Sequence, residues 1–267
     1  DGTAVAADVL LWAEDGPTVL QNWTPITDAT FANHVWSGSA RAKTGGPYRH
    51  QVRFKDTGGN IIGMTPIAVG NWNVGALMAI GGSSGGEGIV TTGTFPANSN
   101  VFKFRFNVWS GMGGTSNGPM CLMANALADR LGMPVGVIAY AASGSTLEEW
   151  SRGDSVFTAF KNAVVKCGGA FEALVFTGGS NDANEGGVDS YAVHLFRVER
   201  LYQMMRDQFG GQDMPALHLG FNRRATANPT QSDMVREVEN TISGYPNITL
   251  VQTLDLEWQS DLTHLTG

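Results

Sequence analysis

Three polar segments, each directly after an apolar run, carry residue types that could catalyse acyl transfer. In the last of them Asp261 stands three positions before His264, after the apolar run 248–254. A neutral imidazole takes a proton from a hydroxyl only when its tautomer and orientation are held, and a nearby carboxylate does both. The pair therefore predicts a general base, His264, with its orienting acid, Asp261.

The other two segments carry groups that could stabilise a negative oxygen in a transition state. Gly144 follows the apolar run 135–140, and a glycine there lets the backbone turn sharply and leaves its N–H free to donate. Asn181 follows the run 173–176, and its amide can donate to the same oxygen. Asp182 could cap the next segment or hold this loop by hydrogen bonds. Gly144 and Asn181 are therefore the predicted oxyanion donors.

From residue 118 onward, strand patterns alternate with helix patterns. Residues 120–131 carry apolar positions at helical spacing between Pro119 and Gly132, which predicts a helix. Further helices are expected at 156–165, 190–209 and 231–242, and strands at 134–141, 173–176, 216–221 and 248–254. This alternation predicts a parallel sheet, whose sites lie at the carboxyl ends of the strands. We therefore expect Gly144, Asn181 and His264 to meet at one edge.

The first 108 residues have a different pattern. Residues 51–55 and 101–106 alternate apolar and polar side chains, and glycine-rich turn signals, among them 58–60 and 81–86, lie between them. The pattern predicts antiparallel strands without a long helix. We expect an inserted β module at 39–108, within an α/β domain of residues 1–38 and 109–267. Glycine-rich hairpins that decorate a larger sheet are the alternative.

Composition excludes several classes of partner and site. The 267 residues carry a formal net charge of −7 without a Lys or Arg cluster, which argues against nucleic acid. No apolar run is long enough to cross a bilayer. Cys121 and Cys167 are expected to be buried thiols rather than a disulfide. Four histidines lack the neighbours of a zinc site and are expected to be packed or surface residues: His34, His50, His194 and His218.

The motifs resemble the SGNH/GDSL hydrolases and, among them, the sialate O-acetylesterase-like carbohydrate esterases. The resemblance covers residues 117–267 well and 1–38 loosely. It rests on Asn117-Gly118-Pro119, Gly144-Ser145-Thr146 with Glu149-Trp150, Gly179-Ser180-Asn181-Asp182 and Asp261-Leu262-Thr263-His264. It implies a three-layer α/β/α sandwich with a parallel sheet, here with a β module. The implied activity is hydrolysis of O-acetyl groups on carbohydrate, without a metal or cofactor.

The resemblance leaves the nucleophile unassigned. In the family it is a serine in a Gly-Asp-Ser or Gly-Gln-Ser-Asn block at the end of the first strand, and residues 1–38 contain no such block. We therefore expect the nucleophile upstream of this chain, in a longer polypeptide. Ser116 lies in a similar tetrapeptide, 114–117. Asn117 already begins the Gly-Pro helix, however, so Ser116 is the weaker candidate.

Two functions remain open. One is a serine esterase that acts on acetylated carbohydrate. The other is a non-catalytic glycan-binding or structural component, as in a phage tail or cell-surface assembly, which keeps the fold without its nucleophile. An extracellular, periplasmic or virion-associated location is expected, and an oligomer is compatible with the sequence. The β-rich part has tryptophans that could pack in a core or stack on sugars: Trp36, Trp72 and Trp109.

Overall fold

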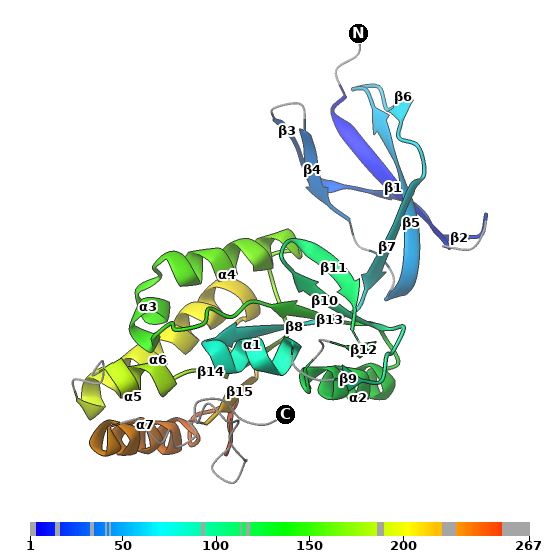
Figure 1. The fold of residues 1–267 in the computed structure, drawn as a ribbon. Helices are drawn as coiled ribbons and strands as arrows, with labels where there is room; N and C mark the ends of the chain where they lie inside the picture. Colours follow the sequence, from blue (N-terminus) through cyan, green and yellow to red (C-terminus); the bar gives the residue numbers. More distant parts are fainter. Residues whose placement is uncertain are drawn as a thin grey trace. The chain divides into compact units, whose positions relative to one another are not determined.

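The computed structural model divides the chain into two compact units, Asp1–Gly75 and Ala76–Gly267. We call them the β unit and the α/β unit (Figure 1). The structure describes residues 4–252, apart from 14–16, 33–34, 41, 43, 92–93, 113, 116–117, 186–189 and 221–227.

A seven-stranded sheet forms the centre of the α/β unit, in the order β11-β10-β13-β8-β14-β15-β16. All neighbouring strands are parallel except β10 and β11, which form an antiparallel hairpin. The strands are β8 (Ala76–Gly82), β10 (Val101–Arg105), β11 (Val108–Gly111), β13 (Val135–Ala139), β14 (Ala173–Thr177), β15 (Ala216–Leu219) and β16 (Ile248–Val251). β8 is therefore the central strand, with β13 and β14 on its two sides.

Helices cover both faces of this sheet (Figure 1). One core joins it to α3 (Leu147–Arg152), α4 (Ser155–Lys166), α6 (Tyr191–Met205) and α7 (Pro229–Ile242). The other core joins it to α1 (Ser84–Thr91) and α2 (Met120–Leu131). The short helix α5 (Ser180–Glu185) follows β14, and a π-helical turn, η1 (Arg206–Gly210), continues α6. The unit is thus a three-layer α/β/α sandwich with a mostly parallel sheet, the architecture that the resemblance implies.

The predicted elements after residue 118 are confirmed. Helix α2 has the predicted bounds, and Gly132 ends it with φ 63 while its N–H donates to Ala128 O. The predicted strands and helices appear as β13, α4, β14, α6, β15, α7 and β16, with ends shifted by a few residues. These elements have local signals, because amphipathic spacing and capping residues are visible in the sequence.

The β unit is antiparallel. Its sheet has the order β2-β1-β5-β6, and β7 also pairs with β5. The strands are β1 (Ala6–Ala13), β2 (Val19–Pro25), β5 (Gly45–Lys55), β6 (Ile61–Met64) and β7 (Ala68–Val74), with a separate hairpin of β3 (Thr27–Ala32) and β4 (Val35–Ser39). The carboxylate of Asp8, which is buried, binds Arg53 and Lys55 at 2.6 Å each.

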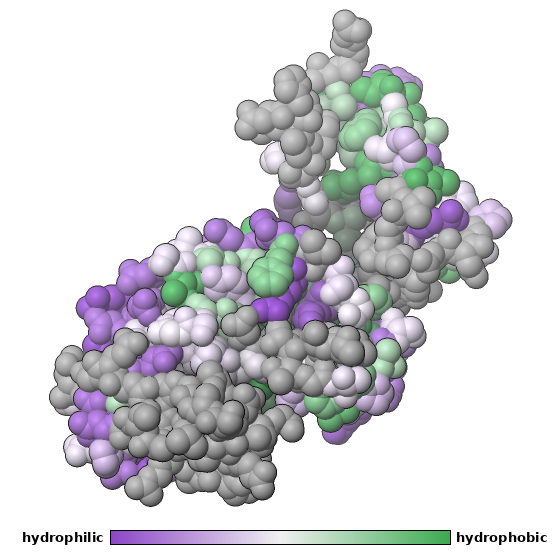
Figure 2. Space-filling model, in the orientation of Figure 1, coloured by the Kyte–Doolittle hydropathy of each residue, from purple (hydrophilic) through white to green (hydrophobic). Residues whose placement is uncertain are grey.

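The two units differ in surface character. On the face drawn in Figure 2, hydrophilic residues predominate over α3 and α4, whereas hydrophobic residues gather on the β unit. On β6, Ile61, Ile62 and Met64 are among the exposed apolar side chains. Of the tryptophans proposed for sugar binding, Trp109 packs on Phe104 with ring centroids 5.3 Å apart. The side chains of Trp36 and Trp72 lie outside the described set.

The predicted domain boundaries are wrong. Residues 1–38 lie in the β unit, because β1 pairs antiparallel with β2 and β5. Residues 76–108 lie in the α/β unit, where β8 is the central parallel strand and the eight-residue helix α1 follows it. The physical reason is that a strand buried on both faces shows no polar alternation. The glycines at its end therefore looked like a hairpin turn.

The structure also describes several of the residues singled out in the sequence. Cys121 and Cys167 are both free thiols, and Cys121 is buried as predicted, whereas Cys167 is only partly buried. Burial raises the pKa of the Cys167 thiol to about 12. His194 and His218 are buried, while His34 lies outside the described residues. Among described residues there is no group of three or more His, Cys, Asp or Glu side chains arranged to hold a metal. No described helix is long and apolar enough to span a membrane.

Candidate active site

Ser83 lies at the carboxyl end of the central strand. It follows Gly82, the last residue of β8, and precedes Ser84, the first residue of α1. The residue is 3% exposed, and its backbone N–H donates to Thr177 O over 3.0 Å. No hydrogen bond joins its hydroxyl to another side chain of the described part of the chain. A serine hydroxyl is thus held at the sheet edge where sites of parallel sheets lie.

The turn that carries Ser83 requires glycine at position 82. Gly82 has φ 127, and a Cβ placed on it would lie 1.9 Å from Thr177 O on the neighbouring strand β14. No side chain fits such a close approach to a backbone oxygen, and L-residues rarely adopt this φ. The glycines before Ser83 therefore let β8 and β14 approach closely at the point where the serine emerges.

We expect Gly82→Ala to lower the unfolding free energy by roughly 3–5 kcal/mol, because it adds a backbone collision to an unfavourable φ. Gly132→Ala is the matched control, since Gly132 has φ 63 with open space around its Cβ position. It should cost about 1–2 kcal/mol. Urea unfolding of the two variants measures the difference. Equal losses would show that the contact with Thr177 does not constrain position 82.

The segment after β13 lies beside the Ser83 turn. Ala142 N donates to Gly82 O over 2.8 Å, which ties the segment to the end of β8. The Ser145 hydroxyl donates to Ala142 O over 2.7 Å and accepts from the Trp150 indole N–H over 2.9 Å. Trp150 is buried against Phe160 and Phe176 in the core. The turn is therefore anchored to the packed interior rather than left as a mobile loop.

Gly144 lies in this anchored turn with φ 80, a conformation that favours glycine. Its N–H makes no hydrogen bond within the described part of the chain. Asn181, at the start of α5, is 7% exposed, and its Nδ2 donates to Ser145 O over 2.9 Å. An amide nitrogen has two hydrogens, so one remains after this bond. Among the described residues, each of the two predicted donors thus has one N–H without a hydrogen-bond acceptor.

The structure therefore brings Gly144 and Asn181 together, from strands on either side of β8, as the sequence predicts. Asp182 holds the same loop, since both of its carboxylate oxygens accept from Leu147 N. Asp261 and His264 follow β16 in the chain and lie outside the described residues, as does Ser116. Their roles as acid, base and weaker nucleophile candidate remain predictions.

The sequence prediction did not single out Ser83, and it placed the nucleophile upstream of the chain, a prediction that the structure does not test. The signal that could have found it is the apolar run 76–80 followed by Gly-Gly-Ser-Ser and a short helix. In α/β enzymes, a glycine-rich turn directly after a buried strand also connects that strand to a helix that begins at the active site. Period-two strands nearby made the glycines look like part of an antiparallel module.

Comparison with known proteins agrees with this fold. A protein from Arabidopsis thaliana is 20% identical with a TM-score of 0.58, over 71% of this chain and 90% of that one. XAC1771, a carbohydrate acetylesterase from Xanthomonas citri, is 14% identical with a TM-score of 0.68, over 99% of this chain and 66% of that one. At these identities the likeness shows the fold. No curated protein sequence matches the chain.

A family model described as carbohydrate esterase, sialic acid-specific acetylesterase, matches residues 105–267. The matched range is more than half of the chain. It contains Gly144, Asn181, Asp261 and His264 and begins after Ser83, so the family match and the placement of Ser83 are independent observations. By this match the chain belongs to the carbohydrate esterase family of sialic acid-specific acetylesterases.

Proposed function

We propose that this protein is a serine esterase that removes O-acetyl groups from carbohydrate, with Ser83 as its nucleophile. The observation that carries the proposal is the position of Ser83 at the end of the central strand β8, between the Gly144 turn and Asn181. A hydrolase of this type needs a hydroxyl and oxyanion donors within reach of one carbonyl group. The family description and the similarity in fold to a carbohydrate acetylesterase support acetylated carbohydrate as the substrate class.

The proposed reaction has two halves. The Ser83 hydroxyl oxygen attacks the acetyl carbonyl carbon while His264, oriented by Asp261, takes its proton. The negative oxygen of the tetrahedral intermediate accepts from the Gly144 N–H and the free Asn181 N–H, and each donor contributes about 3 kcal/mol in the transition state. His264 then protonates the departing sugar oxygen, which leaves an acetyl-Ser83 ester. Water attacks this ester with the same proton transfers and releases acetate.

The Ser83 N–H does not enter this scheme, because it donates to Thr177 O. The two donors of the scheme therefore come from the segments after β13 and β14. Ser83 as the proposed nucleophile favours the esterase over a non-catalytic component, since that alternative rested on a missing nucleophile. No cofactor takes part in the proposed reaction.

The test is acetate release from an O-acetylated sialic acid and from p-nitrophenyl acetate. We expect both to be hydrolysed. Hydrolysis of p-nitrophenyl acetate alone would support the esterase activity and reject acetylated sugar as the substrate. Acetate release from neither substrate, by protein shown to be folded, would reject the function.

Asn181→Ala should lower kcat by roughly 10²-fold or more, with a smaller effect on KM, because it removes one donor to the oxyanion. Steady-state kinetics with p-nitrophenyl acetate measures both constants. Asn240→Ala on α7 is the control, because Asn240 is exposed and lies outside the site. An Asn181→Ala enzyme with unchanged kcat would show that Asn181 does not bind the oxyanion.

A further inference from the structure

Asp182 is a carboxylate with no exposure to solvent, next to the proposed oxyanion donor Asn181 at the start of α5. Its two oxygens accept from the backbone N–H of Leu147 over 3.1 and 3.0 Å. Burying a carboxylate is costly unless its charge is compensated by hydrogen bonds or cations. Asp182 is therefore a buried carboxylate directly beside the proposed active site.

The Leu147 N–H is the far end of the Gly144 turn. Asn181 holds the middle of the same turn by donating to Ser145 O. Two consecutive side chains of α5 therefore form hydrogen bonds with the backbone of residues 145 and 147. Thr146, between them, begins α3 with a capping box to Glu149. Loss of the Asp182 contact would free one end of the turn that orients both the Gly144 N–H and the Asn181 amide.

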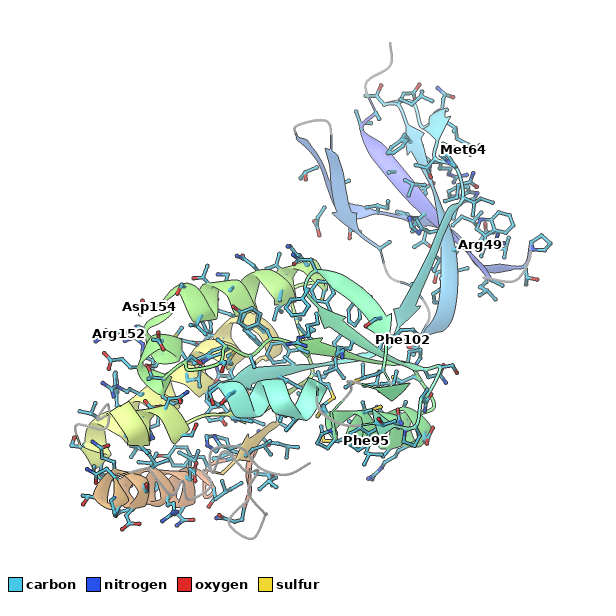
Figure 3. The ribbon with its side chains drawn as sticks, in the orientation of Figure 1. Arg49, Met64, Phe95, Phe102, Arg152 and Asp154 are labelled. Atoms are coloured by element: carbon cyan, nitrogen blue, oxygen red, sulfur yellow. The ribbon has the colours of Figure 1, made fainter. Side chains whose placement is uncertain are left out.

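Charged groups from two other helices face Asp182. Arg197 on α6 is paired with Glu148 on α3 over 2.6 Å, and both act on Asp182 electrostatically. Glu148 also pairs with Arg152, which Figure 3 places with Asp154 at the turn between α3 and α4. His194, one turn before Arg197, is buried as well.

These surroundings set when Asp182 is charged. Burial raises the pKa of Asp182 to about 6, and the Leu147 N–H, its own N–H and Arg197 counteract part of that increase. Burial, with the charges of Arg197 and His218, lowers the pKa of His194 to about 4, so His194 stays neutral above pH 5. Asp182 is therefore ionised at pH 8 and protonated at pH 5.

We propose that Asp182 is a positioning residue for acyl transfer, whose ionised carboxylate holds Leu147 so that Gly144 and Asn181 stay aligned on the oxyanion. The proposal rests on the proposed esterase function. When Asp182 is protonated, one of its oxygens carries a hydrogen, so the two oxygens no longer both accept from the Leu147 N–H. The aligned state is thus present above the pKa of Asp182 and is lost as the pH falls through it.

The experiment compares wild type with Asp182→Asn on p-nitrophenyl acetate from pH 4.5 to 8.5. At pH 8 we expect the variant to lose roughly tenfold in kcat with KM within about twofold, since the oxyanion donors act in the transition state. The ratio of the wild-type kcat to that of the variant should fall from about 10 at pH 8 to about 1 below pH 5, because the wild type then also lacks the charge. The ratio cancels titration of the general base, which both proteins share.

Asp233→Asn on α7 is the control for loss of a carboxylate, since that side chain is 75% exposed, and its ratio to wild type should stay near 1. A ratio for Asp182→Asn that is constant across pH would overturn the proposal while leaving the esterase intact. Wild type without activity at pH 8 would instead reject the esterase function itself. If Asp182→Asn fails to fold, the pH profile of the wild-type kcat is the test. Both the general base and Asp182 should then titrate, so a kcat that falls below pH 7 with the uptake of only one proton overturns the proposal.

Discussion

Ser83→Ala is expected to reduce the hydrolysis of p-nitrophenyl acetate by roughly 10⁴-fold or more. The substitution removes the hydroxyl oxygen that would form the acetyl-enzyme. The residue is small and 3% exposed, and its backbone N–H still donates to Thr177 O. The variant should therefore keep the wild-type fold and melting temperature.

Three controls make this result specific to Ser83. Ser84→Ala changes the neighbouring hydroxyl, and Ser116→Ala changes the serine that resembles the family block by sequence; both should retain activity. A fluorophosphonate should label the wild type once, on the peptide that contains Ser83, and should not label Ser83→Ala. Activity that survives Ser83→Ala, or that disappears in Ser116→Ala, would assign the nucleophile elsewhere.

His264→Ala should reduce kcat by about 10⁴-fold, because no other group would take the proton from Ser83 and return it to the sugar oxygen. Asp261→Asn should give a smaller loss, since the imidazole remains but its tautomer is no longer held. Steady-state kinetics at pH 8 measures both effects.

His50→Ala is the matched control, because His50 lies on β5 of the other unit, and it should keep wild-type kcat. A His264→Ala enzyme with wild-type kcat would show that the base is elsewhere. An effect of Asp261→Asn larger than that of His264→Ala would contradict the role of Asp261 as the orienting acid.

Local patterns in the sequence were sufficient for much of the α/β unit. Helix α2 has its predicted bounds because Pro119 and Gly132 punctuate an amphipathic stretch. Strand β14 was also predictable, because its buried apolar run is followed by Gly178 and Gly179. The pairing of Gly144 with Asn181 was also predictable, because parallel strands bring their carboxyl ends to one edge.

The sequence by itself determined the family, the alternation of strands and helices after residue 118, and the residue types of the predicted oxyanion donors. Only the tertiary structure decided which strand is central and which serine it presents. The reason is that β8 is defined by its neighbours: its residues pair with residues of β13 and β14 that come 59 and 95 positions later in the chain. Gly82 is glycine because Thr177 O approaches it, and that contact does not exist until the sheet forms. A glycine-rich hairpin turn and a glycine-rich turn that presents a serine at the end of a strand use the same residue types, so the local sequence could not distinguish them.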